Sequence, residues 1–318
     1  MVRPYNVARI LLFPFTRRAA RVEWMTTIDS ALVRALIADQ FPQWAHLPVA
    51  PVEYGGWDNR TFHLGDRMSV RLPSAPGYVG QVEKEQRWLP VLAPQLPLPI
   101  PAPLGAGRPS TLFPHPWSVY GWIDGTPAIA RPPRNLVEFA DDVARFLVAL
   151  RAADATGGPP PGEHNFFRGA SPAHYDDQTR VAIRELDGRI DAPLATAAWE
   201  HALAATFTGA PVWFHGDIAV GNLLLDDSGR LCAVIDFGTS GVGDPACDLA
   251  LAFNSLEGES RRVYRERLGV DDATWSRGRG WALWKALIVV AGSPAPPAET
   301  ARQRRVIDEV LEDFAESA

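Results

Sequence analysis

Residues 213–225 read WFHGDIAVGNLLL, and the organisation of the whole chain can be worked out from this stretch. An apolar segment gives way to His215, Gly216 and Asp217, and a second apolar segment begins directly after Asn222. Glycine beside polar side chains is typical of a tight turn between strands. The same pattern is typical of a catalytic loop that presents a carboxylate at the end of a buried strand. The residues that follow distinguish the two interpretations.

A β-hairpin is predicted directly after this stretch. Residues 223–225 and 231–235 are apolar, and the sequence DDSG between them supplies turn residues. Folding the second strand back onto the first brings Asn222, which precedes the hairpin, close to Asp236, which follows it. Asp217 lies one short loop away from Asn222. Two carboxylates and one carboxamide are therefore expected at the same end of the hairpin.

These three side chains indicate metal-phosphate chemistry. Oxygen donors with few nitrogen or sulfur donors nearby suit Mg²⁺, which shares its coordination with water and phosphates. A carboxylate that accepts a hydroxyl proton, beside a metal held by Asn and Asp, is the minimum apparatus of phosphoryl transfer. Asp217 and Asn222, followed by Asp236-Phe237-Gly238, have the spacing of the kinase catalytic loop and its metal-binding aspartate. Three elements in this order favour a catalytic loop over a polar turn.

The segments HGDIAVGN (215–222), VIDFG (234–238) and GVGDPACDLA (241–250) together resemble the aminoglycoside phosphotransferase family, small-molecule relatives of the protein kinases. The resemblance covers most of residues 50–290 at the level of element order, and its motifs are more specific in the second half of the chain. It implies an α+β, bilobal protein-kinase-like fold, with a β-rich N-lobe and a mainly helical C-lobe. It also implies ATP or GTP as the phosphate donor and a small hydroxylated acceptor.

The resemblance assigns roles to six polar residues of the C-lobe. Asp217 resembles the catalytic base, and Asn222 and Asp236 resemble the Mg²⁺ ligands. His215 is expected to fix the loop rather than to react. Asp244 and Asp248 are expected to brace the catalytic loop or to cap the next helix, in preference to contacting substrate.

In the N-lobe the match is looser. The sequence GGWDNRTF, which includes Asn59, stands where the family's phosphate-covering loop would be, but it is not G-x-G-x-x-G, and an ordinary hairpin turn is an alternative. Arg71 stands where the family usually places lysine. Arginine keeps the charge and can bind phosphate oxygens through two N–H groups, so Arg71 is favoured as a working substitute. Lys84 taking over this role, or a non-catalytic nucleotide-binding pseudokinase module, is the alternative.

The acidic partner of Arg71 is expected on the helix predicted within residues 79–93. Glu83 and Glu85 lie two positions apart, so they cannot share a helical face. Leu89 and Leu92 follow Glu85 by four and seven positions, which puts Glu85 beside the buried face. Glu85 is therefore the predicted partner.

The apolar segment WSVYGWIDG (117–125) resembles the family's interlobe linker, which binds adenine through backbone groups. By that alignment Gly121 and Ile123 supply these groups. Tyr120 and Trp122 beside them are explained equally well as core residues.

Composition and the rest of the chain set the outer limits. With 318 residues, 47% hydrophobic, the chain is long enough for one bilobal unit, predicted as an extension at 1–24, an N-lobe at 25–123 and a C-lobe at 124–318. The apolar stretch of the first segment, ILLFPF, is too short for a membrane span or a secretory core, so a cytoplasmic protein without a membrane partner is expected. The net charge of −6 disfavours a nucleic-acid partner. Lysine occurs only at positions 84 and 285, which weakens any argument from a missing lysine.

The acceptor is predicted to be a small molecule. Eleven residues separate Asp236 from Asp248, and no Ala-Pro-Glu follows, which leaves no room for a peptide-binding activation segment. A cationic aminoglycoside or other antibiotic and an endogenous sugar or amino alcohol are both open, and a hydrolase using the same metal is a weaker alternative. Trp281 and Trp284, three apart on a helix, are interpreted either as lining the acceptor site or as core. The acids that would meet a cationic acceptor, unless they are solvated helix faces, are Glu257, Glu259, Asp308, Glu309, Glu312 and Asp313.

Overall fold

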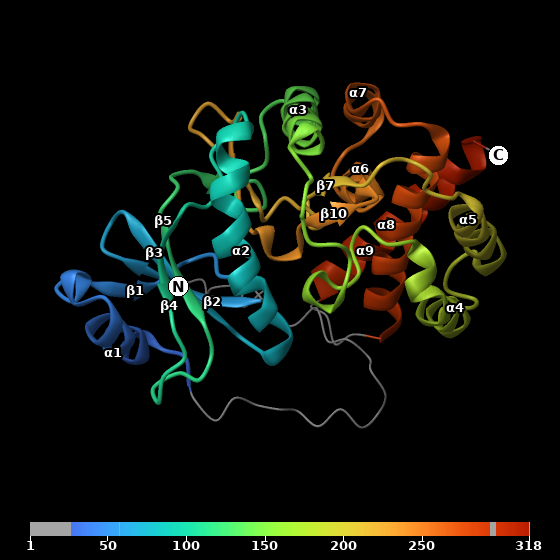
Figure 1. The fold of residues 1–318 in the computed structure, drawn as a ribbon. Coiled ribbons are helices and arrows are strands. Elements are labelled where there is room, and N and C mark those ends of the chain that lie inside the picture. Colours follow the sequence, from blue (N-terminus) through green and yellow to red (C-terminus); the bar gives the residue numbers. More distant parts are fainter. Residues whose placement is uncertain (1–26, 57, 293–296, 318) are drawn as a thin grey trace.

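The computed structural model describes residues 27–56, 58–292 and 297–317. Two lobes lie side by side, a sheet-containing N-lobe and a larger, mostly helical C-lobe (Figure 1). The predicted α+β bilobal fold is therefore confirmed. The predicted extension at 1–24 lies outside the described residues, and the lobe boundary at 123/124 stays a prediction. No helix of the described ranges is both long and apolar enough to cross a bilayer.

An antiparallel five-stranded sheet in the order β1-β2-β3-β5-β4 forms the N-lobe. Its strands are β1 (Val49–Pro51), β2 (Asn59–Leu64), β3 (Met68–Pro73), β4 (Pro103–Gly107) and β5 (Trp117–Gly121). Helix α1 (Ser30–Gln40) begins where the Asp29 carboxylate accepts hydrogen bonds from the amides of Ala31 and Leu32. It packs through Val33 and Leu36 against the apolar face of the sheet.

Helix α2 (Val79–Leu92) connects the lobes and has two buried faces of different character (Figure 1). Leu89 and Leu92 join the hydrophobic core that the C-lobe builds. Gln81, Lys84 and Glu85 are polar and are buried as well. Buried polar side chains require hydrogen-bond partners, so this face of α2 is where interlobe polar contacts are expected.

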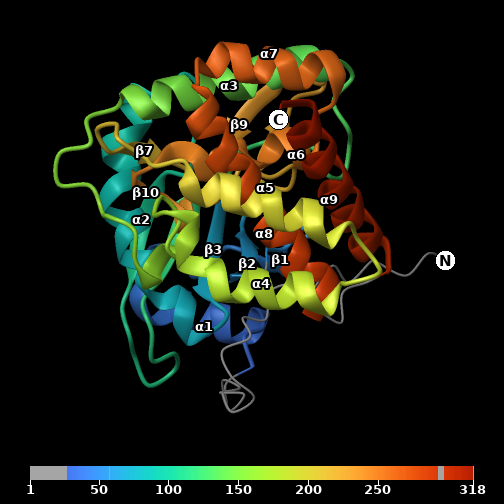
Figure 2. The ribbon, with the colours of Figure 1, turned by 90° about the vertical axis from the view of Figure 1, so that its right-hand side faces the viewer.

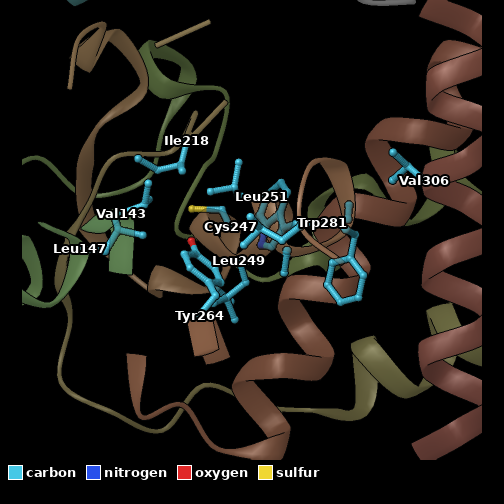
Figure 3. Packing of buried hydrophobic residues seen from close by; sticks show 14 of the residues in the cluster. Val143, Leu147, Ile218, Cys247, Leu249, Leu251, Tyr264, Trp281 and Val306 are labelled. Carbon is cyan, nitrogen blue, oxygen red and sulfur yellow. The ribbon is translucent and has the colours of Figure 1, made fainter. Parts of the chain in front are cut away.

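Seven helices make up most of the described part of the C-lobe. They are α3 (Leu136–Ala152), α4 (Asp176–Glu185), α5 (Ala192–Ala204), α6 (Leu251–Asn254), α7 (Gly258–Leu268), α8 (Asp272–Gly292) and α9 (Pro297–Ser317). Helices α3 and α7 lie side by side in both views, and α8 runs behind α4 and α5 (Figure 2). Figure 3 shows Ile218, Val143 and Leu147 on one side of the C-lobe core, with Trp281 and Val306 on the other. Ile218 thus anchors the loop that contains Asp217 in this core.

Two small antiparallel sheets lie at the interlobe side of these helices. One pairs β7 (Val212–Phe214) with β10 (Gly241–Gly243), and the other has the order β6 (Thr126–Pro127), β8 (Leu223–Leu225), β9 (Leu231–Val234). Strands β8 and β9 are the predicted hairpin, and their turn is held by the Asp226 carboxylate, which accepts from Ser228 and from the amide of Arg230. The hairpin prediction is confirmed.

Candidate active site

The loop after β7 is tight because of one glycine. Gly216 has φ +85°, and a Cβ atom there would lie 2.6 Å from the carbonyl oxygen of Thr239. Any side chain at this position would therefore clash with backbone as well as strain the turn. The glycine lets the chain reverse between His215 and Asp217 while it touches the segment after Asp236.

Asp248 holds this loop through hydrogen bonds to its backbone. Its buried carboxylate accepts the amide of His215 at 3.0 Å and the amide of Gly216 at 2.7 Å. Burial raises the pKa of Asp248, while the two amides and His215 favour the charged form. Asp244 makes different contacts: it caps the 3-10 helix η7 (Pro245–Ala250) and forms a buried ion pair with Arg277, whose Nε donates at 2.6 Å.

His215 links the two catalytic motifs. The amide of Asp217 donates to its Nδ1 at 3.3 Å, so Nδ1 is unprotonated, and Nε2 carries the proton that is donated to the Ile235 carbonyl at 3.1 Å. The ring thus joins the HGD turn to the residue before Asp236 through hydrogen bonds. These contacts fit the expected loop-fixing role.

Asp217 and Asn222 lie together, as the hairpin geometry predicts. The side-chain amide of Asn222 donates to the Asp217 carboxylate at 3.0 Å and to the Asp217 carbonyl at 2.9 Å. The amide of Ile235 in turn donates to the Asn222 carbonyl at 2.9 Å. This hydrogen bond joins the two strands at the end of the hairpin opposite its turn, next to Asp236.

Asp236 has a backbone conformation that few side chains adopt. Its φ is +67°, a left-handed value that costs about 1–3 kcal/mol outside glycine, although aspartate tolerates it better than most residues. Such strain is retained where the surroundings determine it, and it concentrates at functional sites. At Gly238 a Cβ would lie 2.6 Å from the Gln81 side-chain oxygen, so a larger residue there would require the end of the Gln81 side chain to shift.

Arg71 joins the N-lobe to this aspartate. Its guanidinium donates to Asp236 at 3.0 Å and to Glu85 at 3.5 Å. Burial opposes the charge of both Arg71 and Asp236, but mutual attraction prevails, and it raises the pKa of Arg71 and lowers that of Asp236. Tyr120 is buried and donates its hydroxyl to Glu85 at 2.8 Å. The predicted pairing of Arg71 with Glu85 is therefore present, while Glu83 is exposed and lines a separate cavity of about 440 Å³.

Lys84 is engaged elsewhere. Its amine donates to the carbonyls of Gly238 at 2.6 Å and Ser240 at 2.9 Å, and it lies 3.3 Å from His164 Nδ1. Burial lowers the pKa of Lys84 to about 7. The geometry ties α2 to the segment after Asp236 and does not support Lys84 as a replacement for Arg71.

The segment that begins with Gly55 and Gly56, which we call the glycine loop, contributes a carboxylate that the sequence did not predict. Asp58 accepts from the Gln81 side chain at 3.3 Å, and burial together with the charges of Asp236 and Asp217 raises its pKa to about 7. We call Asp58, Asp217 and Asp236 the carboxylate cluster. Asn59, beside Asp58, is buried at the start of β2. The position of the charged Asp58 shortly after two adjacent glycines was the feature of the sequence that could have indicated its role.

The predicted adenine-binding segment is partly used by the sheet. The amide of Gly121 donates to the Ala102 carbonyl at 2.9 Å, and that of Trp122 to the Arg67 carbonyl at 2.8 Å. Ile123 is half-buried directly after β5. An adenine contact at Gly121 would therefore have to use its carbonyl.

The acids expected to meet a cationic acceptor are scattered over the C-lobe. Trp281 and Trp284 are buried and contribute to the core. Glu259, Glu309 and Asp313 are taken up in ion pairs with Arg262, Arg261 and Arg279. Asp308 and Glu312 are exposed on α9, and Glu257 precedes α7. The structure does not gather these six into one acceptor-binding surface.

The two lobes and the interlobe carboxylate cluster define a protein-kinase-like phosphotransferase fold. The sequence model described as the phosphotransferase enzyme family (APH) matches residues 49–281, well over half of the chain, so the protein belongs to this family. It is therefore a phosphotransferase that acts on an alcohol group of a small molecule.

Three solved structures illustrate the fold. The GDP complex of an aminoglycoside 2'-phosphotransferase-IIIa mutant is 18% identical, with TM-score 0.65, over 91% of this chain and 97% of that chain. A streptomycin–ATP ternary complex of APH(2")-IIa is 17% identical, with TM-score 0.57, over 91% and 97%. Macrolide 2'-phosphotransferase type I is 19% identical, with TM-score 0.58, over 91% and 98%. A comparison with curated proteins found no match.

Proposed function

We propose that the protein transfers the γ-phosphoryl group of ATP or GTP to a hydroxyl of a small molecule, with Mg²⁺ as cofactor. The observation that carries this proposal is the convergence of Asp217, Asn222 and Asp236 at one end of the hairpin, with Arg71 paired to Asp236 and Glu85. Use of a nucleoside triphosphate fits the cytoplasm, where the enzyme is expected to act.

Asn222 and Asp236 would hold the magnesium. Mg²⁺ takes one or two protein oxygen ligands and completes its octahedron with water and phosphates, and an amide oxygen plus a carboxylate meets this need. Among the described residues no group of three or more His, Cys, Asp or Glu is arranged as a metal site, so a site that relies on substrate phosphates fits better than a full protein cage. Burial, followed by repulsion from Asp236 and Asp217, raises the pKa of Asp58, and a cation bound there would relieve the repulsion. Bound there, the metal would offset charge on the phosphates.

Asp217 is assigned as the base. As the acceptor oxygen bonds to the γ-phosphorus, the bond from that phosphorus to the β,γ-bridging oxygen breaks, and the nucleoside diphosphate leaves. The hydroxyl proton goes to the Asp217 carboxylate, which His215 and Asp248 hold in position through the loop backbone. Arg71 would hold donor phosphate, and Gly55, Gly56, Asp58 and Asn59 would cover it.

The acceptor is assigned to the class of small molecules that carry a hydroxyl group. Related structures bear the names of aminoglycoside and macrolide phosphotransferases and include complexes with kanamycin, gentamicin and streptomycin. An antibiotic acceptor would make the protein a resistance enzyme. An endogenous sugar or amino alcohol would make it a metabolite kinase.

Asp217→Asn tests the base. We expect turnover to fall by about 10²–10⁴-fold, because the amide cannot accept the proton, with Mg·ATP affinity and unfolding temperature nearly unchanged. Asp227→Asn, at a fully exposed carboxylate in the hairpin turn, is the matched control and should keep full activity. Retention of full activity by pure Asp217→Asn would refute the assignment.

A non-catalytic nucleotide-binding module is the second candidate, and the arginine at position 71 is the observation that favours it. Titration of Mg·ATP followed by an acceptor screen separates the two. Binding without transfer to any acceptor supports the module, whereas phosphate release that is independent of acceptor supports a hydrolase.

A further inference from the structure

Lys285, on α8, has a shielded amine with no partner. Its Nζ is inaccessible to solvent and makes no hydrogen bond within the described residues, although the rest of the side chain is half-exposed. Trp281 lies one turn earlier on the same helical face, and Trp284 directly precedes Lys285. A lysine ammonium is rarely buried without a counter-charge, so this position needs a functional explanation.

The charges around Lys285 include members of the carboxylate cluster. Burial lowers its pKa to about 7, and the neighbouring Arg168 lowers it further, whereas Asp217, Asp58 and Glu299 act in the opposite direction. Glu299 is shared, because it pairs with Arg302 and accepts from the Gln303 side chain. Asp217 and Asp58, two members of the carboxylate cluster, thus lie within electrostatic reach of Lys285.

Arg168 brings a second cation to the same place. Its Nε donates to the Gly216 carbonyl at 3.2 Å, directly before Asp217. Its guanidinium lies over the rings of Trp281 and Trp284, with centroids at 5.1 and 4.9 Å, and one of its terminal nitrogens is buried without a partner. Tyr175 stacks on Trp284 with ring centroids 4.0 Å apart. Arg168 thus brings a buried, unpaired N–H donor next to the residue before Asp217, and it packs on two tryptophans of the helix that carries Lys285.

We propose that Lys285 and Arg168 form an oxyanion-binding subsite, and that the acceptor is a hydroxylated molecule carrying a carboxylate or phosphate group. This inference rests on the proposed function, because it describes the acceptor of the same reaction. A bound oxyanion accepts hydrogen bonds from both cations and supplies the counter-charge that the fold lacks. A polycationic acceptor would bring further positive charge against two buried cations, and the acids predicted for such an acceptor lie elsewhere.

The first test compares acceptors that share one ring. D-Glucose, D-glucosamine, D-glucuronate and D-glucose 6-phosphate are neutral, cationic, carboxylate and phosphate versions of the same framework, and kanamycin is added as a polycation. Each is assayed for nucleoside diphosphate release and for a new phosphate ester by ³¹P NMR. We expect kcat/KM for an anionic member to exceed that of glucose at least tenfold. Preference for glucuronate or for glucose 6-phosphate separates a carboxylate from a phosphate acceptor.

Lys285→Gln is the decisive variant. We expect it to raise KM for the anionic acceptors at least tenfold. The KM for glucose should stay within about twofold of the parent value, and Mg·ATP binding should be unchanged. Arg262→Gln, at an exposed arginine on α7, is the matched charge-loss control and should change none of these. An equal loss of kcat on every acceptor would overturn the proposal, since Lys285 would then act on the transferred phosphoryl group. Higher kcat/KM on glucosamine, kanamycin or glucose overturns it while the proposed function stands.

A second readout does not depend on turnover. The chain has two lysines, so protein carrying [¹³Cε]lysine gives two side-chain signals, and Lys285→Gln assigns them. With Mg·ADP present to fill the donor side, inorganic phosphate or acetate should raise the pKa of the Lys285 signal by about one unit, and chloride should not. An unmoved Lys285 signal, or movement of the Lys84 signal alone, overturns the subsite even if phosphoryl transfer is intact.

Discussion

Arg71 and Lys285 meet the carboxylate cluster from opposite lobes, and they are held in opposite ways. Arg71 has a carboxylate on either side, Glu85 and Asp236, and both contacts stabilise its charge. Lys285 has no hydrogen-bond partner among the described residues, and burial lowers its pKa to about 7. The donor side is therefore organised before anything binds, whereas the acceptor side keeps donors whose partners have to arrive with a ligand.

This difference has a physical cost that the fold must carry. Unused buried donors destabilise the folded state, so they persist where binding recovers the loss. Paired charges such as Arg71 and Asp236 contribute little net stability but make removal of one partner expensive. Variants on the two sides should consequently behave differently, and the following predictions test that.

The largest effect is expected from Arg71→Met. It leaves Glu85 and Asp236 without their cation, and we expect the free energy of unfolding to fall by about 3 kcal/mol, the lower end for a broken buried pair because Asp236 is partly exposed. Transfer should fall as well, since the proposed phosphate contact is lost. Denaturant unfolding and turnover measure the two effects, with exposed Arg60→Met on β2 as control. A loss below about 1 kcal/mol would mean that the donor side is not organised by this pair.

An intermediate effect is expected from Asp248→Asn. An amide can accept one of the two loop N–H groups but turns its own NH₂ toward the other, so a buried donor is left unsatisfied. We expect about 1–3 kcal/mol of destabilisation together with slower turnover. Asp272→Asn, at an exposed carboxylate at the start of α8, should stay within about 0.5 kcal/mol of the parent protein. Equal stability of the two variants would contradict the bracing role of Asp248.

The last effect is a change with pH and concerns Lys285. The folded pKa of about 7 lies below the ordinary lysine value of 10.5, so between these values the unfolded chain binds more protons and stability rises with pH. Lys285→Met removes this contribution. The variant should therefore gain stability relative to the parent protein, more at pH 6 than at pH 10, with a slope of at most about 1.4 kcal/mol per unit. Paired urea titrations across pH measure the difference, to which Lys84 contributes equally in both proteins, and a flat difference would show that Lys285 is not buried as a cation.

Local sequence patterns predicted the hairpin and the meeting of Asp217, Asn222 and Asp236, because a short turn fixes which residues lie together. Helical periodicity likewise selected Glu85 over Glu83, and Glu85 contacts Arg71. The roles of these residues stay predictions until variants are measured.

Long-range placement could not be predicted in the same way. Asp58 lies near Asp236 only because the glycine loop of one lobe folds over the other, and its burial depends on that closure. Arg168 and Lys285 are far from Asp217 in sequence, and no periodicity relates them. Whether the candidate acids would be free to meet a cationic acceptor could not be predicted either, because ion pairs such as Arg261–Glu309 and Arg279–Asp313 form between separate helices.

The scarcity of lysine has a practical consequence. Lys84 and Lys285 both lie inside helices with shielded amines, and residues 1–26 contain no lysine. A lysine-specific endoprotease therefore has two cleavage sites in this chain, and each becomes accessible only when its helix opens. The fraction of chain that survives such digestion reports how much of a preparation is folded, without labels and without a known acceptor.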